Sequence, residues 1–168
     1  DTDGVRGRGD LALLQDLEAA AEFVIATAGE PITAAYLGRI NAQLTRSAAL
    51  NPGKLRRAEQ GIGVHTAHGR HEPAAMTAEG LDALIQEQLL LDDALRSAAH
   101  LFVEVARAQP FEDGNKRTAI FAANSYLIGQ ETGLLMAVPH DDADPTVSRE
   151  FHDQLARAYV FGETGPVV

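Results

Sequence analysis

Residues 109–119 read QPFEDGNKRTA, and a helical pattern of apolar residues lies on each side of them. The Asp-Gly pair in this stretch predicts a turn, because glycine adopts a positive φ without strain and aspartate hydrogen-bonds to its own backbone. A helix is expected to start at Asn115 or a neighbouring residue. The free N–H groups and the dipole of that helix would add to the positive charges of Lys116 and Arg117. The stretch therefore predicts a phosphate-binding site.

Two acidic residues and a proline complete the local chemistry. Glu112 and Asp113 would place carboxylates at the mouth of the phosphate site. Mg²⁺ favours such oxygen ligands and often bridges them to phosphates, so the pair indicates a place for this ion. Pro110 disfavours the α conformation at Gln109, and the preceding helix is therefore expected to end just before it.

The stretch resembles the signature of the Fic/Doc (Fido) family, which is His-x-Phe-x-Asp/Glu-Gly/Ala-Asn-Gly/Lys-Arg. The matching positions are Phe111, Asp113, Gly114, Asn115, Lys116 and Arg117. At the first position the chain has Gln109, where the family has its catalytic histidine. Members of the family transfer AMP, other nucleotide-derived groups or phosphate from a nucleotide to a protein hydroxyl. The resemblance implies this activity, with ATP as donor and Mg²⁺ as cofactor, in a protein that lacks its base.

The resemblance also implies a role for each matching residue. Asp113 takes the place of the metal-binding acid, and Gly114, Asn115 and Lys116 take places that contact phosphate. Arg117 takes the place of the catalytic arginine, which also binds phosphate and neutralises its charge. The amide at position 109 has no accessible pKa, although it can still form hydrogen bonds. The loss of a general base typically lowers the rate by about 10²–10⁴.

Two features leave the chemistry open. Lys116, with Ile120 in place of a second arginine, is similar to the Doc-like branch, which transfers phosphate rather than AMP. Gln109 has three explanations: an introduced substitution that silences a toxic enzyme, a natural nucleotide-binding pseudo-enzyme, or chemistry that uses another base or none. The other histidines considered as a base are His100, His140 and His152, and nothing in the sequence places them in the site.

Residues 60–73 are expected to form a β-hairpin that resembles the family's flap, whose edge pairs with the backbone of a target protein. The resemblance implies that Ile62, Gly63 and Val64 dock the target. The alternative function is a binding module that engages a partner through residues 60–73. Three histidines, His65, His68 and His71, recur here. Residues three apart on a strand point to opposite faces, and no neighbouring carboxylate completes a ligand set, so we expect no metal there.

The apolar periodicity predicts an all-α protein, and the resemblance, which covers roughly residues 30–160, implies the Fic fold: a bundle of six to seven helices with the small hairpin. The expected organisation is a flexible leader at 1–9, one Fic-like domain at 10–160 and a tail at 161–168. The residues expected to cap helices are Thr33, Thr77, Asp92 or Asp93, and Asp144. A helix is expected over 10–28, and Asn124 is expected to bond one helix to another.

The composition limits the partners. The net charge of −10 argues against a nucleic-acid-binding surface, and no apolar run reaches the length of a membrane span. The 168 residues include no cysteine, so disulfides are excluded and a cytoplasmic location is the default expectation. A target protein bound through the flap is the expected partner, and a small antitoxin would fit a toxin of this family.

Overall fold

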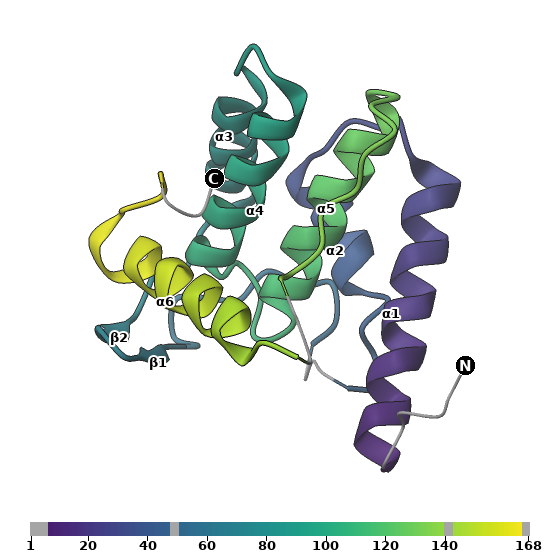
Figure 1. Ribbon diagram of the computed structural model, residues 1–168. Helices are drawn as coiled ribbons and strands as arrows, with labels where there is room; N and C mark the ends of the chain where they lie inside the picture. Colours follow the sequence, from purple (N-terminus) through teal and green to yellow (C-terminus); the bar gives the residue numbers. More distant parts are fainter. Residues whose placement is uncertain (1–6, 48–50, 140–142, 166–168) are drawn as a thin grey trace.

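The computed structural model describes residues 7–47, 51–139 and 143–165, and these form six helices and one two-stranded hairpin (Figure 1). In chain order the elements are α1 (Arg8–Thr27), α2 (Ala34–Asn41), β1 (Val64–Thr66), β2 (Gly69–His71), α3 (Ala78–Leu89), α4 (Ala94–Ala108), α5 (Asn115–Gly129) and α6 (Pro145–Phe161). The prediction of an all-α bundle with a small hairpin is confirmed. No helix within the described ranges combines the length and the hydrophobicity that crossing a membrane requires.

Helices α4 and α5 form the centre of the bundle. Figure 1 shows α5 between α4 on one side and α1 and α2 on the other, with α3 beside α4. The buried face of α5 includes three small side chains, Ala119, Ala122 and Ala123, which allow the neighbouring helices to approach closely. The buried face of α4 is larger and includes Leu101 and Phe102. This pair of helices flanks residues 109–114, which we call the motif loop.

The ends of the helices follow the local signals in the sequence. Thr33, Thr77, Asp93 and Asp144 each cap a helix by accepting a hydrogen bond from a backbone N–H of its first turn. Helix α4 ends at Ala108, ahead of Pro110, as expected. Gly114 has a φ of 74° and directly precedes α5, which begins at Asn115.

Two expectations differ from the structure. Helix α1 begins at Arg8, so that the last two residues of the predicted leader are helical; residues 1–6 lie outside the described ranges. Asn124 does not join two helices. Its side-chain amide donates to the Met136 carbonyl oxygen at 2.9 Å and accepts from the Met136 N–H at 2.7 Å. It therefore fixes the extended segment that follows α5 against that helix, a contact that periodicity cannot reveal.

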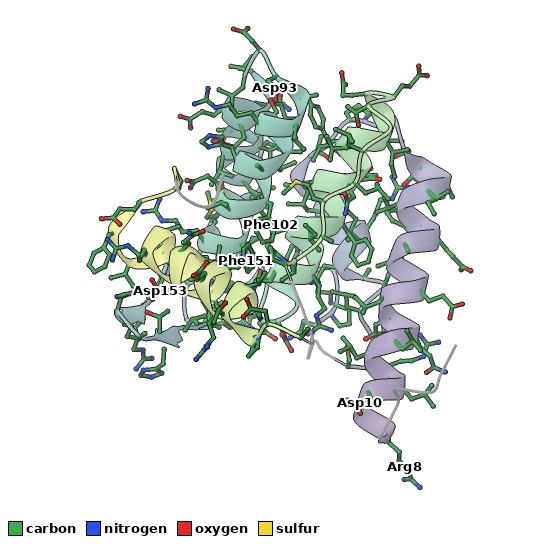
Figure 2. All side chains as sticks on the ribbon, viewed as in Figure 1. Arg8, Asp10, Asp93, Phe102, Phe151 and Asp153 are labelled. Atoms are coloured by element: carbon green, nitrogen blue, oxygen red, sulfur yellow. The ribbon has the colours of Figure 1, made fainter. Side chains whose placement is uncertain are left out.

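Helix α6 covers both α4 and the hairpin. The Phe151 ring of α6 stacks on the Phe102 ring of α4 with 6.2 Å between centroids, and Figure 2 shows the two side by side. The strands pair antiparallel, with Val64 opposite His71. At the hairpin turn, His68 Nε2 lies 2.7 Å from Asp153 Oδ1, and Figure 2 shows Asp153 on the side of α6 nearest the hairpin. The hairpin is thereby held beneath α6.

Candidate active site

Arg56 anchors the start of the motif loop. Its backbone N–H donates to the Pro110 carbonyl at 2.9 Å, and its side-chain Nε donates to the Gln109 carbonyl at 2.7 Å. The same guanidinium donates to the carbonyls of Pro73 and Ala74 at 2.7 and 3.0 Å. The Arg56 residue is only 4% exposed, and burial lowers the pKa of its guanidinium. One buried side chain therefore ties the motif loop to the segment that follows the hairpin.

Asn41, at the end of α2, anchors the other end of the loop. Its Nδ2 donates to the Asp113 carbonyl at 3.0 Å and to Thr118 Oγ1 at 3.1 Å. Its Oδ1 accepts from the Gly53 N–H at 2.8 Å. The side chain is fully buried with all these groups paired, so it fixes the turn in which Asp113 and Gly114 lie.

Asn115 closes the loop from within. Its Oδ1 accepts from the Phe111 N–H and its Nδ2 donates to the Phe111 carbonyl, both at 2.9 Å. The Phe111 ring is buried in the core. Because this side chain is engaged by the loop backbone, the group with which Asn115 could bind a ligand is its backbone N–H, in the first turn of α5.

A cavity of about 310 Å³ opens between the motif loop, the first turn of α5 and the segment entering β1. The predicted site residues all line it: Ile62, Gly63, Val64, Gln109, Asp113, Gly114, Asn115, Lys116 and Arg117. A second cavity of about 440 Å³ lies between the hairpin and α6. The two cavities share Val64, Lys116 and Tyr159, so they adjoin, and each is within the size range of small-molecule sites.

Gln109 lies at the wall of the first cavity in a strained conformation. Its φ of 46° is in the left-handed region, which costs a residue other than glycine about 1–2 kcal/mol. The Arg56 contacts to the Gln109 and Pro110 carbonyls hold the backbone there. The residue is only 5% exposed and is one of those that line this cavity. A side-chain amide can donate or accept a hydrogen bond here but cannot take up a proton.

Asp113 and Arg117 form the charged part of the site. Arg117 Nη2 lies 3.8 Å from Asp113 Oδ1, and the Asp113 side chain is 57% exposed. The described residues contain no cluster of three or more acidic, histidine or cysteine side chains that would hold a metal on their own. A single open carboxylate fits Mg²⁺ when phosphate oxygens and water supply the remaining ligands, which is a common arrangement for this ion.

Two of the histidines considered as an alternative base lie away from the motif loop. His100 of α4 borders a separate cavity with Arg96 and Thr164. His152 of α6 borders the second cavity, and its Nδ1 lies 2.6 Å from the Ser148 carbonyl oxygen. His140 falls outside the described residues. The hairpin histidines form no metal cluster in the described part of the chain, although Asp153 supplies His68 with a carboxylate that the sequence did not reveal.

Sequence reasoning missed the residues that hold the site in place. Arg56 stands close to Lys54 and Arg57 in the sequence, which gives no sign that its side chain is buried beneath the motif loop. Asn41, Ser47 and Tyr159 carried no signal that linked them to the site. The one available hint was a polar residue, Asn41, at the end of an apolar helical stripe, which is unusual unless its polar groups are paired.

The Fic/DOC family model matches residues 31–127. This is 97 of 168 residues, more than half of the chain, and the chain therefore belongs to the Fic/DOC family. Among the solved structures, the chain is similar to the BepC protein of Bartonella tribocorum, a VirB-translocated effector crystallised with bound AMPPNP, with a TM-score of 0.57 and 18% identity. That similarity covers 94% of this chain and 81% of BepC and shows a shared fold. A comparison with curated proteins gave no match.

Proposed function

We propose that the chain is a nucleotide-dependent transferase of protein hydroxyl groups, weakened by Gln109. It transfers AMP, another nucleotide-derived group or phosphate from ATP to a target protein. The observation that carries the proposal is that the motif residues line one cavity together with the residues that lead into the hairpin. The AMPPNP bound to BepC, an analogue of ATP, supports the same ligand class.

The phosphates would lie at the first turn of α5. The N–H groups of Asn115, Lys116 and Arg117 have no acceptor within the helix at these positions. The two side-chain charges of Lys116 and Arg117 add to the helix dipole, and this combination favours a polyanion. Asp113 is the residue that would hold Mg²⁺, which when bound neutralises charge on the transferred group. The nucleoside would extend past Lys116 into the second cavity.

The target hydroxyl would approach along the segment Ile62–Val64, which borders the first cavity opposite the motif loop. An extended segment at the edge of a two-stranded sheet offers backbone groups for pairing with a target chain. Gln109 would then contact the hydroxyl by a hydrogen bond without removing its proton. A protein target, a small antitoxin partner and a cytoplasmic location all remain predictions from the sequence.

The test is protein labelling by Gln109→His beside the unchanged chain, in a cell lysate with Mg²⁺ and ATP labelled separately at the α and γ phosphates. We expect histidine to raise transfer by about 10²–10⁴ because it restores a general base. α-Label would indicate transfer of AMP, and γ-label transfer of phosphate. Gln130→His is the matched control, since Gln130 is exposed at the far end of α5.

A second function, a nucleotide-binding module without transfer activity, rests on a specific observation. No histidine is among the described residues that line the first cavity. If the protein is such a binding module, Gln109→His would bind ATP yet give no label on any protein. The hairpin at 60–73 would then serve to engage a partner. Equal labelling by the unchanged chain and by Gln109→His would contradict the second function and the weakening by Gln109, and transfer would then use another base or none.

A further inference from the structure

The guanidinium of Arg117 is held from two sides. Its Nη1 donates to Ser47 Oγ at 2.5 Å, and its Nη2 lies 3.8 Å from Asp113 Oδ1. Ser47 lies in the loop after α2, 70 residues away in the sequence. Of these two contacts the one to Ser47 is the hydrogen bond, so Ser47 rather than Asp113 fixes the direction of the arginine.

The Ser47 hydroxyl is itself oriented by a carboxylate. Its Oγ donates to Asp16 Oδ2 at 2.7 Å, and the Ser47 N–H donates to the same oxygen at 2.7 Å. A hydroxyl has one proton and two lone pairs. Because the proton is directed at Asp16, the lone pairs remain for Arg117. An anion on one side and a cation on the other strengthen both hydrogen bonds.

Asp16 is a fully buried residue in the middle of α1. Both of its oxygens accept from the Arg46 N–H at 3.1 Å, and Arg46 Nη1 lies 3.7 Å from Oδ1. Burial by itself raises the pKa of Asp16, but the hydrogen bonds from Ser47 and Arg46 and the charge of Arg46 outweigh it and lower the pKa. A buried carboxylate is costly unless it is paired, and here every pairing group belongs to the segment that reaches Arg117.

We infer that Asp16 and Ser47 are positioning residues, which act through Arg117 to hold its guanidinium toward the phosphates of a bound nucleotide. The inference rests on the proposed function for its ligand, but its contacts belong to this chain. Asp16 lies in α1, outside the residues that match the family. Helix α1 thereby supports the phosphate site in addition to packing Val24 into the core.

The test compares the binding of ATP with Mg²⁺ to the binding of adenosine, which has no phosphates. Ser47→Ala should weaken ATP binding by about tenfold, the value of one charge-assisted hydrogen bond, and leave adenosine binding unchanged. Ser47→Thr, which keeps the hydroxyl, should restore ATP binding. Ser125→Ala is the matched control, because it removes the hydroxyl of a serine that hydrogen-bonds to Tyr36 at 2.6 Å and not to Arg117.

The hydrogen bonds that connect Asp16 through Ser47 to Arg117, which we call the relay, predict two further results. Asp16→Asn should weaken ATP binding in the same direction as Ser47→Ala. In an Arg117→Ala background, Ser47→Ala should have no additional effect, because the residue through which Ser47 acts is gone. Independent losses in the double variant, or equal losses for ATP and adenosine, would assign Ser47 a merely structural role and overturn the inference.

A measurement without nucleotide separates this inference from the proposed function. NMR relaxation of the Arg117 side-chain Nε–H reports whether the guanidinium is immobile in the full chain. We expect it to be ordered in the unchanged protein and mobile in Ser47→Ala. If the protein binds no ATP and this difference is still seen, the proposed function fails and the relay stands. If Arg117 is equally ordered in both, the relay is wrong whatever the protein binds.

Discussion

The motif loop and the hairpin border the same cavity but are held in different ways. The loop is fixed by buried polar side chains, above all Asn41 and Arg56, whose donors meet backbone carbonyls of the loop. The hairpin has strands of three residues and is held by two histidines. His68 pairs with Asp153, with side chains 22% and 50% exposed, and His71 Nε2 lies 2.7 Å from the Arg107 carbonyl oxygen. Buried polar contacts are costly to break, whereas exposed pairs contribute little.

This difference fits the two tasks of the proposed function. Phosphate chemistry requires donors that are in place before the ligand arrives, because reorganising them would consume binding energy. Docking of a target tolerates a surface that adjusts to its partner. In this protein the rigid part is the loop between the two central helices, and the adjustable part is the short hairpin. The changes below test this contrast, from the largest expected effect to the smallest.

Arg56→Ala should have the largest effect, because it removes the contact that joins the two regions. The carbonyls of Gln109, Pro73 and Ala74 would lose a charged donor, and we expect the free energy of unfolding to fall by about 3 kcal/mol or more. Chemical denaturation measures this loss. Arg57→Ala is the control: its exposed side chain pairs with the exposed side chain of Glu59, so the change should be within about 0.5 kcal/mol. A loss below 1 kcal/mol for Arg56→Ala would contradict the account of a rigidly held loop.

Asp16→Asn should lower stability at neutral pH by about 1–2 kcal/mol, since the amide cannot accept all the hydrogen bonds that the carboxylate accepts. The folded protein lowers the pKa of Asp16. Its stabilisation is therefore complete above the pKa of about 3.9 of an unfolded aspartate, and is lost as the pH falls through the lower pKa of the folded state.

Denaturation curves of the unchanged chain and of Asp16→Asn should thus differ at pH 7 and converge in acid. Glu18→Gln on the exposed face of the same helix provides a control that should show neither effect. A difference in stability that stays constant from pH 7 to pH 3 would mean that folding does not lower the pKa of Asp16.

His68→Ala should have the smallest effect on global stability, within about 1 kcal/mol, because the contacts that it breaks, with the Asp153 carboxylate and the Phe161 ring, lie at the surface of the protein. Its local effect should be clear. The backbone amides of the hairpin strands should exchange faster with solvent, and those of the motif loop should not change. His65→Ala, an exposed residue of β1, is the control. Faster exchange in the motif loop would mean that the two regions open together and that the contrast is wrong.

The local parts of the fold were predictable because short-range chemistry decides them. The chain signals the end of α4 with Pro110, the turn with Gly114 and the helix starts with residues such as Thr33 and Asp93, each within a few positions of its effect. The family signature likewise lies in one continuous stretch. Its residues line one cavity, while the catalytic role of each remains a prediction.

The residues that hold the site in place were not predictable, because long-range contacts decide their positions. Arg56 looks like a member of a surface cluster in the sequence, and only the fold places it beneath Gln109. Asp16 fits the polar face of an amphipathic helix as well as it fits a buried anchor. Nothing local distinguishes these outcomes, because the partner that pairs with each side chain comes from a distant segment.

The spacing of those partners also bears on how the protein folds. The contacts from Gln109, Asp113 and Arg117 to their supports close loops of 53, 72 and 70 residues. Contacts so distant along the chain form late, since the entropy of closing the loop is lost before they are made. Helices α4 and α5, joined by the short motif loop, can pair first. The molecule therefore forms its scaffold of α4 and α5 before Asn41, Ser47 and Arg56 reach the motif loop and the start of α5.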